Sequence, residues 1–178
     1  HTDNRRQRQM CIRDSFSYPD SSIFRMLSDE RIAADKPLAR ELGCQVGDQW
    51  VQISGLRTLG DEGMPICLAN VYVIPEYGSI AQRLGGSSRP VYEMIAETFK
   101  ESIENIAIRL TAGILSEQKA AVLGVEPGSP SLSVSRFYQG RGGRIFEASI
   151  SEHPASNFSY NFEFTRGWQT ADHWSWNN

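Results

Sequence analysis

The sequence has 178 residues, of which 40% are hydrophobic, so it is long and apolar enough to bury the core of one globular domain. A formal net charge of −3 argues against a nucleic-acid-binding surface, which needs clustered Lys and Arg to neutralise phosphates. The three cysteines are too few and too widely spaced for a disulfide framework or a paired-cysteine zinc site. No apolar run approaches the roughly 18 residues that cross a bilayer, so we expect a cytoplasmic chain without a membrane segment.

The two ends of the chain lack the apolar periodicity of a packed element. Residues 1–15 are polar and basic, and we expect them to be disordered. Within them, residues 10–15 resemble the translation of a sequencing-library adapter; a native basic linker is the alternative. Residues 169–178 are polar apart from two tryptophans and are expected to form a flexible tail. The folded domain is therefore expected over residues 16–168.

The first predicted elements are a strand, a short helix and a hairpin. Residues 23–32 are a candidate strand, and Asp35 is a candidate N-cap for a helix that stops at Gly43. Residues 50–57 and 65–74 are rich in β-branched and aromatic types and flank a glycine-containing turn, as the strands of a hairpin do.

A further helix comes next, and a strand and a short helix then follow it, in the same order as the first strand and helix. Pro90 begins a helix whose apolar residues form one stripe over residues 91–99. Residues 103–115 alternate as a long strand does, and Ser116 can cap a helix that ends at Gly124.

A second hairpin and a last strand complete the prediction. Residues 132–138 and 144–151 are predicted strands, joined by a turn whose glycines tolerate positive φ. Four aromatics, spaced two apart, would lie on one face of a strand that follows: Phe158, Tyr160, Phe162 and Phe164.

Residues 38–57 and 119–138 resemble each other at an offset of 81 residues. Both contain a candidate helix, a Leu-Gly pair, a second glycine four residues on and then a strand. The repeat predicts two helix-plus-hairpin halves in one antiparallel sheet, and thus an α+β fold with flanking helices. Chance similarity is the alternative, because glycines are common in the turns between helices and strands.

An ordered series of short motifs spans residues 39–164: W-x-x-x-x-G-L-R, G-M-P-I-C, R-P-V-Y, L-G-V-E-P-G-S-P, S-R-F-Y and E-A-S-I-S-E-H-P-A. In this order and spacing they resemble the UTRA domain, the effector-binding half of the HutC subfamily of GntR-type transcription regulators. The resemblance implies a chorismate-lyase-like fold, a ligand cleft between sheet and helix, and a homodimer formed through the sheets. It implies that a small-molecule effector modulates DNA binding.

The resemblance also implies a winged helix-turn-helix before this domain. Only residues 1–22 precede the first candidate strand, so we expect the DNA-binding half to be absent from this sequence. Either the sequence is truncated or the protein is a stand-alone sensor, and DNA would be contacted only through the missing domain.

The second hairpin carries three candidate effector-binding residues. If Gln139 and Arg144 close its turn, Arg136 lies directly opposite Glu147. The pair is either a structural ion pair or a ligand contact, in which Glu147 accepts hydrogen bonds from hydroxyl or amino groups. Ser149 shares the face of Glu147 on an extended strand and adds a polar contact.

The resemblance supplies two further candidates, Arg57 and Tyr92. Arg57 matches a ligand-facing arginine, which suits a carboxylate or phosphate, or else it is a solvated charge at a strand end. Tyr92 matches the family's helix tyrosine and either binds an anion near the helix N-terminus or packs in the core. The second Arg and the Ser of the family's sugar-phosphate sensors become Leu59 or Gly55, and Pro90, so we expect another polar or anionic metabolite.

The chief alternative function is a lyase acting on chorismate or a related acid, because it is similar in fold and in its arginine and glutamate. The sequence shows no nucleophile elbow, metalloprotease or Walker motif, and we interpret His153 before Pro154 as a structural turn residue. We therefore expect no enzyme activity, no cofactor and no bound metal. A dimerisation module without a ligand is a third possibility, and it would require Arg57, Arg136 and Glu147 to be solvated.

Overall fold

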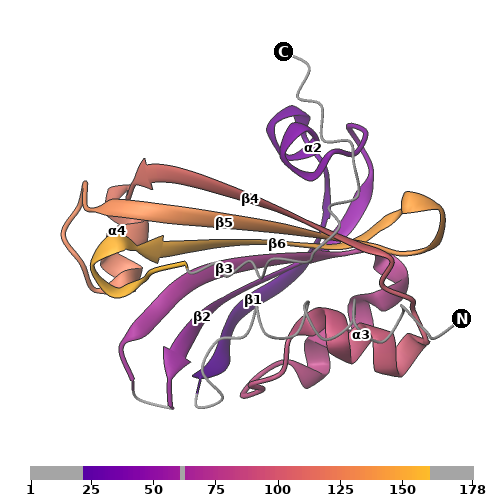
Figure 1. The fold of residues 1–178 in the computed structure, drawn as a ribbon, viewed down its shortest axis with the longest axis horizontal. Coiled ribbons are helices and arrows are strands. Elements are labelled where there is room, and N and C mark those ends of the chain that lie inside the picture. Colours follow the sequence, from indigo (N-terminus) through magenta and orange to yellow (C-terminus); the bar gives the residue numbers. More distant parts are fainter. Residues whose placement is uncertain (1–21, 61–62, 161–178) are drawn as a thin grey trace, which may run out of the picture. The chain divides into compact units, whose positions relative to one another are not determined.

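A six-stranded antiparallel sheet forms the framework of the domain (Figure 1). The computed structural model describes residues 22–60 and 63–160. The strands are β1 (Ser22–Ala33), β2 (Gln49–Leu59), β3 (Pro65–Val73), β4 (Asn105–Ile114), β5 (Pro130–Gln139) and β6 (Ile145–Pro154), and they lie in the order β1-β2-β3-β6-β5-β4. All five pairings are antiparallel, which confirms the expected α+β fold with an antiparallel sheet.

Short helices connect these strands. In the described residues they are α2 (Lys36–Leu42), α3 (Val91–Phe99) and α4 (Glu117–Leu123), with 3-10 helices η1 (Pro75–Arg83), η2 (Arg141–Gly143) and η3 (Ala155–Asn157). The Asp35 carboxylate accepts a hydrogen bond from the Leu38 N–H at 2.9 Å, and the Ser116 hydroxyl accepts one from the Lys119 N–H at 3.4 Å. Both predicted N-caps therefore form.

The two halves of the sheet repeat one local geometry at an offset of 81 residues. α2 and α4 each end at a glycine whose φ, 68° or 69°, lies in the left-handed region. The Gly47 N–H donates to the Ala34 carbonyl at 2.7 Å, and the Gly128 N–H donates to the Leu115 carbonyl at 2.9 Å. Each half is a strand, a short helix and a hairpin, which confirms the predicted repeat.

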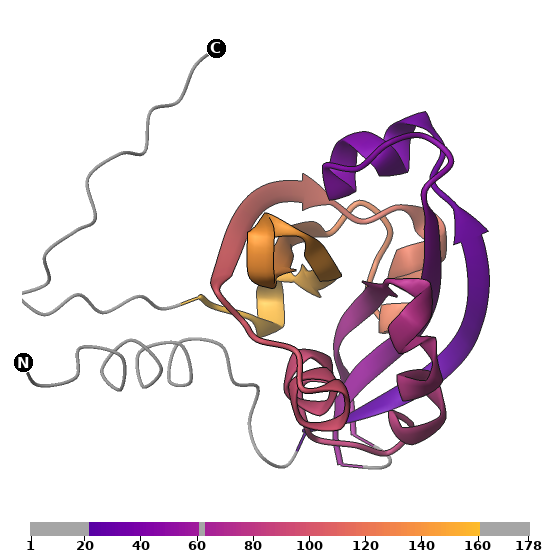
Figure 2. The ribbon, with the colours of Figure 1, turned by 90° about the vertical axis from the view of Figure 1, so that its right-hand side faces the viewer.

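Alternation along the strands gives the sheet two faces, and α2 and α4 lie on the same one (Figures 1 and 2). Leu123 of α4 packs in a small buried cluster with Leu56 of β2. Glu41 of α2 accepts a hydrogen bond from the Ser135 hydroxyl of β5 at 3.1 Å. Because Leu56 and Ser135 both point to this side, we call it the α2/α4 face.

The opposite side, the α3 face, is covered by α3 and η1. A Cβ on Gly78 of η1 would lie 2.8 Å from a methyl carbon of Val51 on β2, so only glycine allows this close approach. The main hydrophobic core lies under these two segments and includes Ile53, Val73, Ile80, Leu84 and Ile95, all fully or almost fully buried. The α3 face therefore supplies most of the fold's hydrophobic stabilisation.

Among the elements, one candidate strand is confirmed, one 3-10 helix was missed, and part of one expected strand is not a strand. The candidate first strand, residues 23–32, is confirmed as β1 and carries a bulge between Met26 and Ser28. η1 was not predicted, because its residues carry a proline, a glycine and no long apolar stripe. Residues 158–160 of the expected last strand are not a strand in the structure, and its residues 161–164 lie outside the described residues.

The predicted disordered segment, residues 1–15, and the predicted tail, residues 169–178, also lie outside the described residues. None of the helices in the described ranges is long and apolar enough to span a membrane.

Candidate functional site

A column of buried polar side chains runs along β6 on the α3 face. Glu147, Ser149, Ser151 and His153 alternate along the strand and therefore share this face, and all four are buried. Burying polar groups costs free energy unless each finds a partner. This column of buried polar side chains, near the centre of the sheet, is the candidate binding site.

Arg136 stands beside this column, although not where the sequence placed it. It pairs with Ser149, whereas Glu147 lies opposite Tyr138, so the predicted direct Arg136–Glu147 pair is wrong. The turn closes at Gly140, whose N–H bonds the Arg144 carbonyl, and a bulge beyond Tyr138 shifts the register by two residues in all. An even shift keeps both charged side chains on the α3 face, as diagonal neighbours.

Glu147 is a buried acid of the site with one oxygen that has no hydrogen-bond partner among the described residues. The residue is 2% exposed, and the oxygen in question is Oε2. Burial raises the pKa of this carboxyl well above its ordinary value of 4.5, and the positive charge of Arg136 offsets part of that rise. Burial therefore favours the neutral acid as long as no ligand is bound.

His153 lies at the far end of the column and is fully buried. Its Nδ1 is 3.2 Å from the Leu132 carbonyl, and its ring stacks on Phe158 with 3.7 Å between centroids. Burial, together with the charge of Arg136, lowers the pKa of this imidazole to about 4. The interpretation of His153 as a turn residue is wrong, because it lies in β6 opposite Leu132.

Arg57 occupies the same face at the end away from Glu147. It is 6% exposed, and its Nη1 donates to the Ser22 hydroxyl at 3.3 Å and to the Ser88 carbonyl at 3.4 Å. In the pairing of β2 with β3, Arg57 lies opposite Cys67. Cys67 is six residues along β3 from Val73, and Val73 is the residue that lies opposite Glu147 on β6. A solvated strand-end charge is therefore excluded, and Arg57 instead joins the sheet to the segment before α3.

Tyr92 lies over the Glu147 end of the face. Its ring stacks on Tyr138, with centroids 4.5 Å apart and planes at 18°, and Tyr138 is the residue opposite Glu147. The Tyr92 hydroxyl donates to Glu93 at 3.3 Å. The ring thus belongs to the core while the hydroxyl is held at the rim of the polar cluster.

The structure brings Arg136, Glu147 and Ser149 together and places Tyr92 above them. Arg57 lies at the other end of the face and bonds to Ser88, in the segment that leads to Tyr92. Sequence reasoning missed three further members of the site: Tyr138, Ser151 and His153. The spacing E-x-S-x-S-x-H, read with period two, was the signal that could have found the last two.

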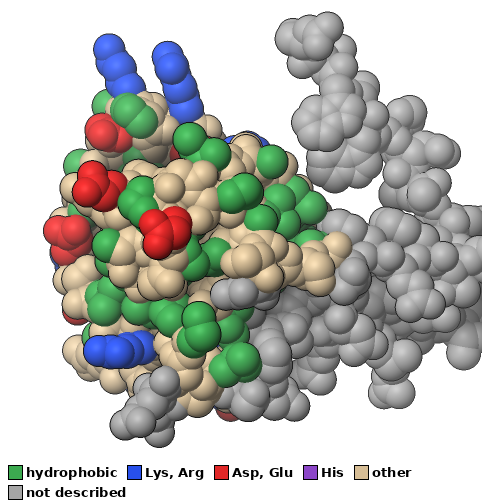
Figure 3. Space-filling view, turned by 90° about the vertical axis from the view of Figure 1, so that its left-hand side faces the viewer, with side chains coloured by type: hydrophobic (Ala, Val, Ile, Leu, Met, Phe, Trp, Pro, Cys, Tyr) green, Lys and Arg blue, Asp and Glu red, His purple; other side chains and the backbone are tan. Residues whose placement is uncertain are grey.

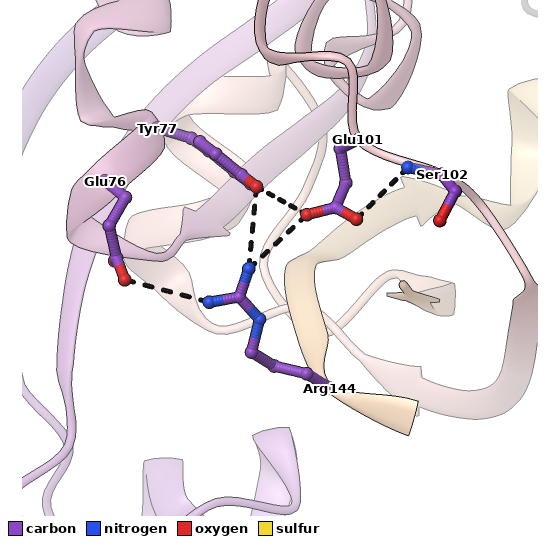
Figure 4. A network of polar contacts seen from close by, with 5 residues as sticks. All are labelled: Glu76, Tyr77, Glu101, Ser102 and Arg144. Atoms are coloured by element: carbon purple, nitrogen blue, oxygen red, sulfur yellow. Dashed lines mark hydrogen bonds and ion pairs between the residues drawn. The ribbon is translucent and has the colours of Figure 1, made fainter. Parts of the chain in front are cut away.

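A second polar network holds the other end of α3 (Figure 4). The Tyr77 hydroxyl of η1 donates to Glu101, which follows α3, and Arg144 from the β5–β6 turn lies 3.4 Å from Glu101 and 3.7 Å from Glu76. The Tyr77 ring stacks on Phe99, with 4.6 Å between centroids. Burial and the contact with Glu101 raise the pKa of Tyr77. The network fastens α3 to η1 and to the second hairpin.

No group of three or more His, Cys, Asp or Glu side chains suited to a metal ion occurs among the described residues. The arrangement offers instead a permanent cation, a carboxyl with an unused oxygen and several hydroxyls. Such a set of converging polar groups recognises a small polar ligand.

The UTRA domain family model matches residues 20–159. A solved structure with a similar fold is the ligand-binding domain of a protein assigned to the GntR family of transcriptional regulators from Bordetella bronchiseptica. It is 23% identical, with a TM-score of 0.69 over 85% of this chain and 94% of that one. A GntR-family regulator from Bacillus cereus is 17% identical, with a TM-score of 0.68 over 82% of this chain and 99% of that one.

The effector domain of PhnF from Mycobacterium smegmatis is 16% identical, with a TM-score of 0.68 over 82% of this chain and 88% of that one. At these identities the structures show a common fold. A search of curated proteins found no match. The family model covers most of the sequence and all of the described sheet, and the chain therefore belongs to the UTRA domain family.

Proposed function

We propose that the chain is the effector-sensing domain of a GntR-type, HutC-like bacterial transcription regulator and works in the cytoplasm without catalysing a reaction. The observation that carries this proposal is Glu147, a buried carboxyl with an unused oxygen beside Arg136 on the α3 face. Effector binding modulates a DNA-binding domain that lies outside this sequence.

The charges of the site favour an effector with an acidic group. Arginine stays protonated at every physiological pH. Burial raises the pKa of Glu147 and lowers that of His153, so it disfavours the charged form of both side chains. A buried guanidinium among these polar groups complements a polar or anionic metabolite.

α3 and the segment before it are the moving parts of the proposed mechanism. The Phe24 N–H and carbonyl bond to Ser87 and Gly86, Arg57 bonds to Ser88, and the Tyr77–Glu101–Arg144 network holds the C-terminal end of α3. An effector that bridges the sheet and α3 clamps this segment. The available coupling is the effector's differential affinity for the two states, typically about 1–3 kcal/mol.

A dimerisation module without a ligand fits the site poorly. That function leaves Arg57, Arg136 and Glu147 solvated, whereas all three are buried. A lyase acting on chorismate shares the expected fold and is distinguished by turnover rather than by geometry.

The test is thermal unfolding of the chain with amino acids, dicarboxylates, sugar acids, sugar phosphates and chorismate, with chorismate also assayed for turnover. A ligand at 100 times its dissociation constant adds about 2.7 kcal/mol and raises the Tm visibly. We expect one class to stabilise the wild type and to act much less on Glu147→Gln, while the exposed control Glu104→Gln responds as the wild type does. Turnover of chorismate, or stabilisation by no compound, contradicts the proposal.

We further propose that the domain forms a homodimer through β4. This strand is the last in the sheet order, is largely exposed and presents apolar side chains such as Leu110 and Ile114. Figure 3 shows hydrophobic side chains, interspersed with charged ones, on the side of the molecule where β4 ends. β4 contains no proline and a single charged residue, Arg109, which pairs with Glu41 at 3.4 Å, so the backbone edge of this strand is open to pairing with another chain.

Light scattering after size-exclusion chromatography tests the dimer. Leu110→Glu is expected to shift the chain to the monomer, whereas Val46→Glu, a change of the same kind at an exposed site before β2, leaves the mass unchanged. A monomeric wild type contradicts the dimer and leaves the sensing proposal intact.

A further inference from the structure

The segment between η1 and α3 lies along an edge of the sheet, and we call its residues 85–89 the strap. The Phe24 N–H donates to the Ser87 carbonyl at 3.0 Å, and the Gly86 N–H donates to the Phe24 carbonyl at 2.9 Å. β1 is an outermost strand of the described sheet, so these two bonds add the strap to its edge as a very short extra strand. The strap therefore covers the first part of the β1 edge.

The strap is held less firmly than the elements on either side of it. Four of its five residues are exposed, whereas Leu84 before it and Val91 after it are buried. Gly85 and Gly86 carry no side chain, and ordering glycine costs more conformational entropy than ordering any other residue. Segments with exposed backbone hydrogen bonds and few apolar contacts open locally while the rest of a fold stays intact. The strap can thus leave the edge of β1 while its two ends stay in place.

Arg57 links the strap to the first residue of β1. Its Nη1 carries two N–H groups and donates to the Ser88 carbonyl at 3.4 Å and to the Ser22 hydroxyl at 3.3 Å. The guanidinium carbon also lies 6.0 Å from the centre of the Phe24 ring. Ser22, Phe24 and Arg57 are all almost fully buried. The guanidinium therefore contacts the strap and the start of β1 at once, so a change in one reaches the other.

We propose that the strap is a conformational switch, which opens and closes on the edge of β1, and that Arg57 transmits its state to the start of that strand. Arg57 is then a positioning residue. A DNA-binding domain that precedes this one would be joined to the same end of β1. An effector that contacts both the sheet and the first turn of α3 keeps the strap closed, because the strap leads into that helix. This output rests on the proposed sensing function, whereas the opening of the strap does not.

Amide hydrogen exchange of the full chain without a ligand, followed by NMR, measures the opening directly. The Phe24 and Gly86 amides are the donors of the two strap bonds, and the amides of the central strand β3 are the reference. We expect the two strap amides to have similar protection factors, at least about 100-fold below those of β3. Their exchange should change little in about 1 M urea, because local opening exposes little surface.

Two substitutions test the link through Arg57. Arg57→Lys keeps the charge but loses the forked geometry, and we expect both strap amides to exchange about tenfold faster, as the loss of one charge-assisted hydrogen bond implies. Ser22→Ala removes the acceptor on β1. It should speed exchange in the wild type but not in Arg57→Lys, because both changes act through one guanidinium. Arg89→Lys, at an exposed arginine of the strap itself, is the control and should leave both rates unchanged.

Gly85→Ala tests the strap without altering the buried arginine. An added Cβ at this position meets no atom within 4 Å, and the backbone there lies outside the left-handed region. Alanine restricts the open strap more than glycine does, so exchange of both strap amides should slow by about two- to fivefold.

The outcomes separate the strap from the sensing function. Equal protection of the strap and β3 amides refutes local opening, and unprotected Phe24 and Gly86 amides refute the closed state. Additive effects of Arg57→Lys and Ser22→Ala refute the link to β1. These three results leave the sensing proposal standing, because no ligand is present. Stabilisation by no compound of the metabolite panel refutes the sensing function and, with it, the output assigned to the strap.

Discussion

The two faces of the sheet treat polar side chains in opposite ways. On the α2/α4 face, the Ser54 hydroxyl lies 2.6 Å from the Asn70 side-chain oxygen, and Gln52 donates to the same oxygen at 3.3 Å. These side chains are partly exposed and satisfy one another. On the α3 face Glu147 is buried with an unused oxygen, which costs about 1–3 kcal/mol without a partner. The buried oxygen of Glu147, unpartnered among the described residues, is the feature of the α3 face that supports the proposed binding site there.

The two halves of the sheet divide the α3 face between them. At the repeat's offset, Gly55 corresponds to Arg136; Gly55 pairs with Ala69, whereas Arg136 pairs with Ser149. The first half therefore places small residues where the second half places a charge and a hydroxyl. In the proposed site most of the polar side chains therefore belong to the second half, and Arg57 is the buried charged residue that the first half contributes to this face.

The largest effect is expected for Gly55→Ala, which alters the small-residue half. The new Cβ would lie 2.3 Å from Phe24 Cζ and 2.7 Å from the Arg25 carbonyl oxygen, so we expect a loss of about 3 kcal/mol in the free energy of unfolding. Gly113→Ala is the control, because its Cβ would meet only the Ser131 hydroxyl at 3.6 Å. Urea denaturation measures both, and equal stability of the two variants would refute the packing role of Gly55.

His153 predicts a loss of stability in acid. Its pKa is about 4 in the folded protein and about 6.5 when unfolded, so the unfolded chain binds more protons between these values. The contribution is fully present above pH 6.5 and is lost as the pH falls to about 4, by an amount on the order of 2–3 kcal/mol. Urea denaturation from pH 4 to 7 should show a shallower decline for His153→Gln, and parallel curves would count against a buried neutral imidazole.

Glu147 predicts the opposite slope. Because its folded pKa is raised above 4.5, the folded chain holds the proton that the unfolded chain releases. Its contribution is present below pH 4.5 and is lost as the pH rises through the folded pKa. Glu147→Gln cannot ionise, so it should gain stability relative to the wild type as the pH rises from 5 to 8. A constant difference between the two proteins would mean that Glu147 has an ordinary pKa.

A smaller effect is expected from the network at the end of α3. Tyr77→Phe removes the hydroxyl that donates to Glu101 and should cost about 1 kcal/mol, with faster amide exchange in α3. Glu97→Gln breaks the Arg89–Glu97 pair, whose side chains are about half exposed, and should leave stability almost unchanged because solvent screens the pair. Equal effects of the two variants would show that the network does not hold α3.

The architecture was largely predictable because its signals are local. Asp35 and Ser116 cap the two helices as expected, and a glycine ends each helix, so these cap and terminating residues alone revealed the repeat. The register of β5 and β6 could not be predicted, because a glycine-rich turn can close in several ways and a bulge leaves no clear mark in the sequence. η1 was missed because a 3-10 segment has neither of the two periods that sequence analysis detects.

The site was predictable only in part. Alternation placed Glu147 and Ser149 on one face, and the resemblance supplied Arg57 and Tyr92. His153 was misassigned because the following Pro154 suggested a turn, whereas Pro154 is the last residue of β6, where the end of a strand tolerates a proline. The burial of Glu147 depends on the placement of α3 over the sheet, which is tertiary information that no single strand carries.

The most direct test of the central claim is amide hydrogen exchange of the chain with and without a metabolite that raises its Tm. If the effector binds on the α3 face, protection increases in residues 147–151 of β6 and in the first turn of α3, and exchange in α2 and α4, which cover the other face, does not change. Protection confined to α2 and α4, or no change in β6 and α3 with a bound effector, would contradict the account.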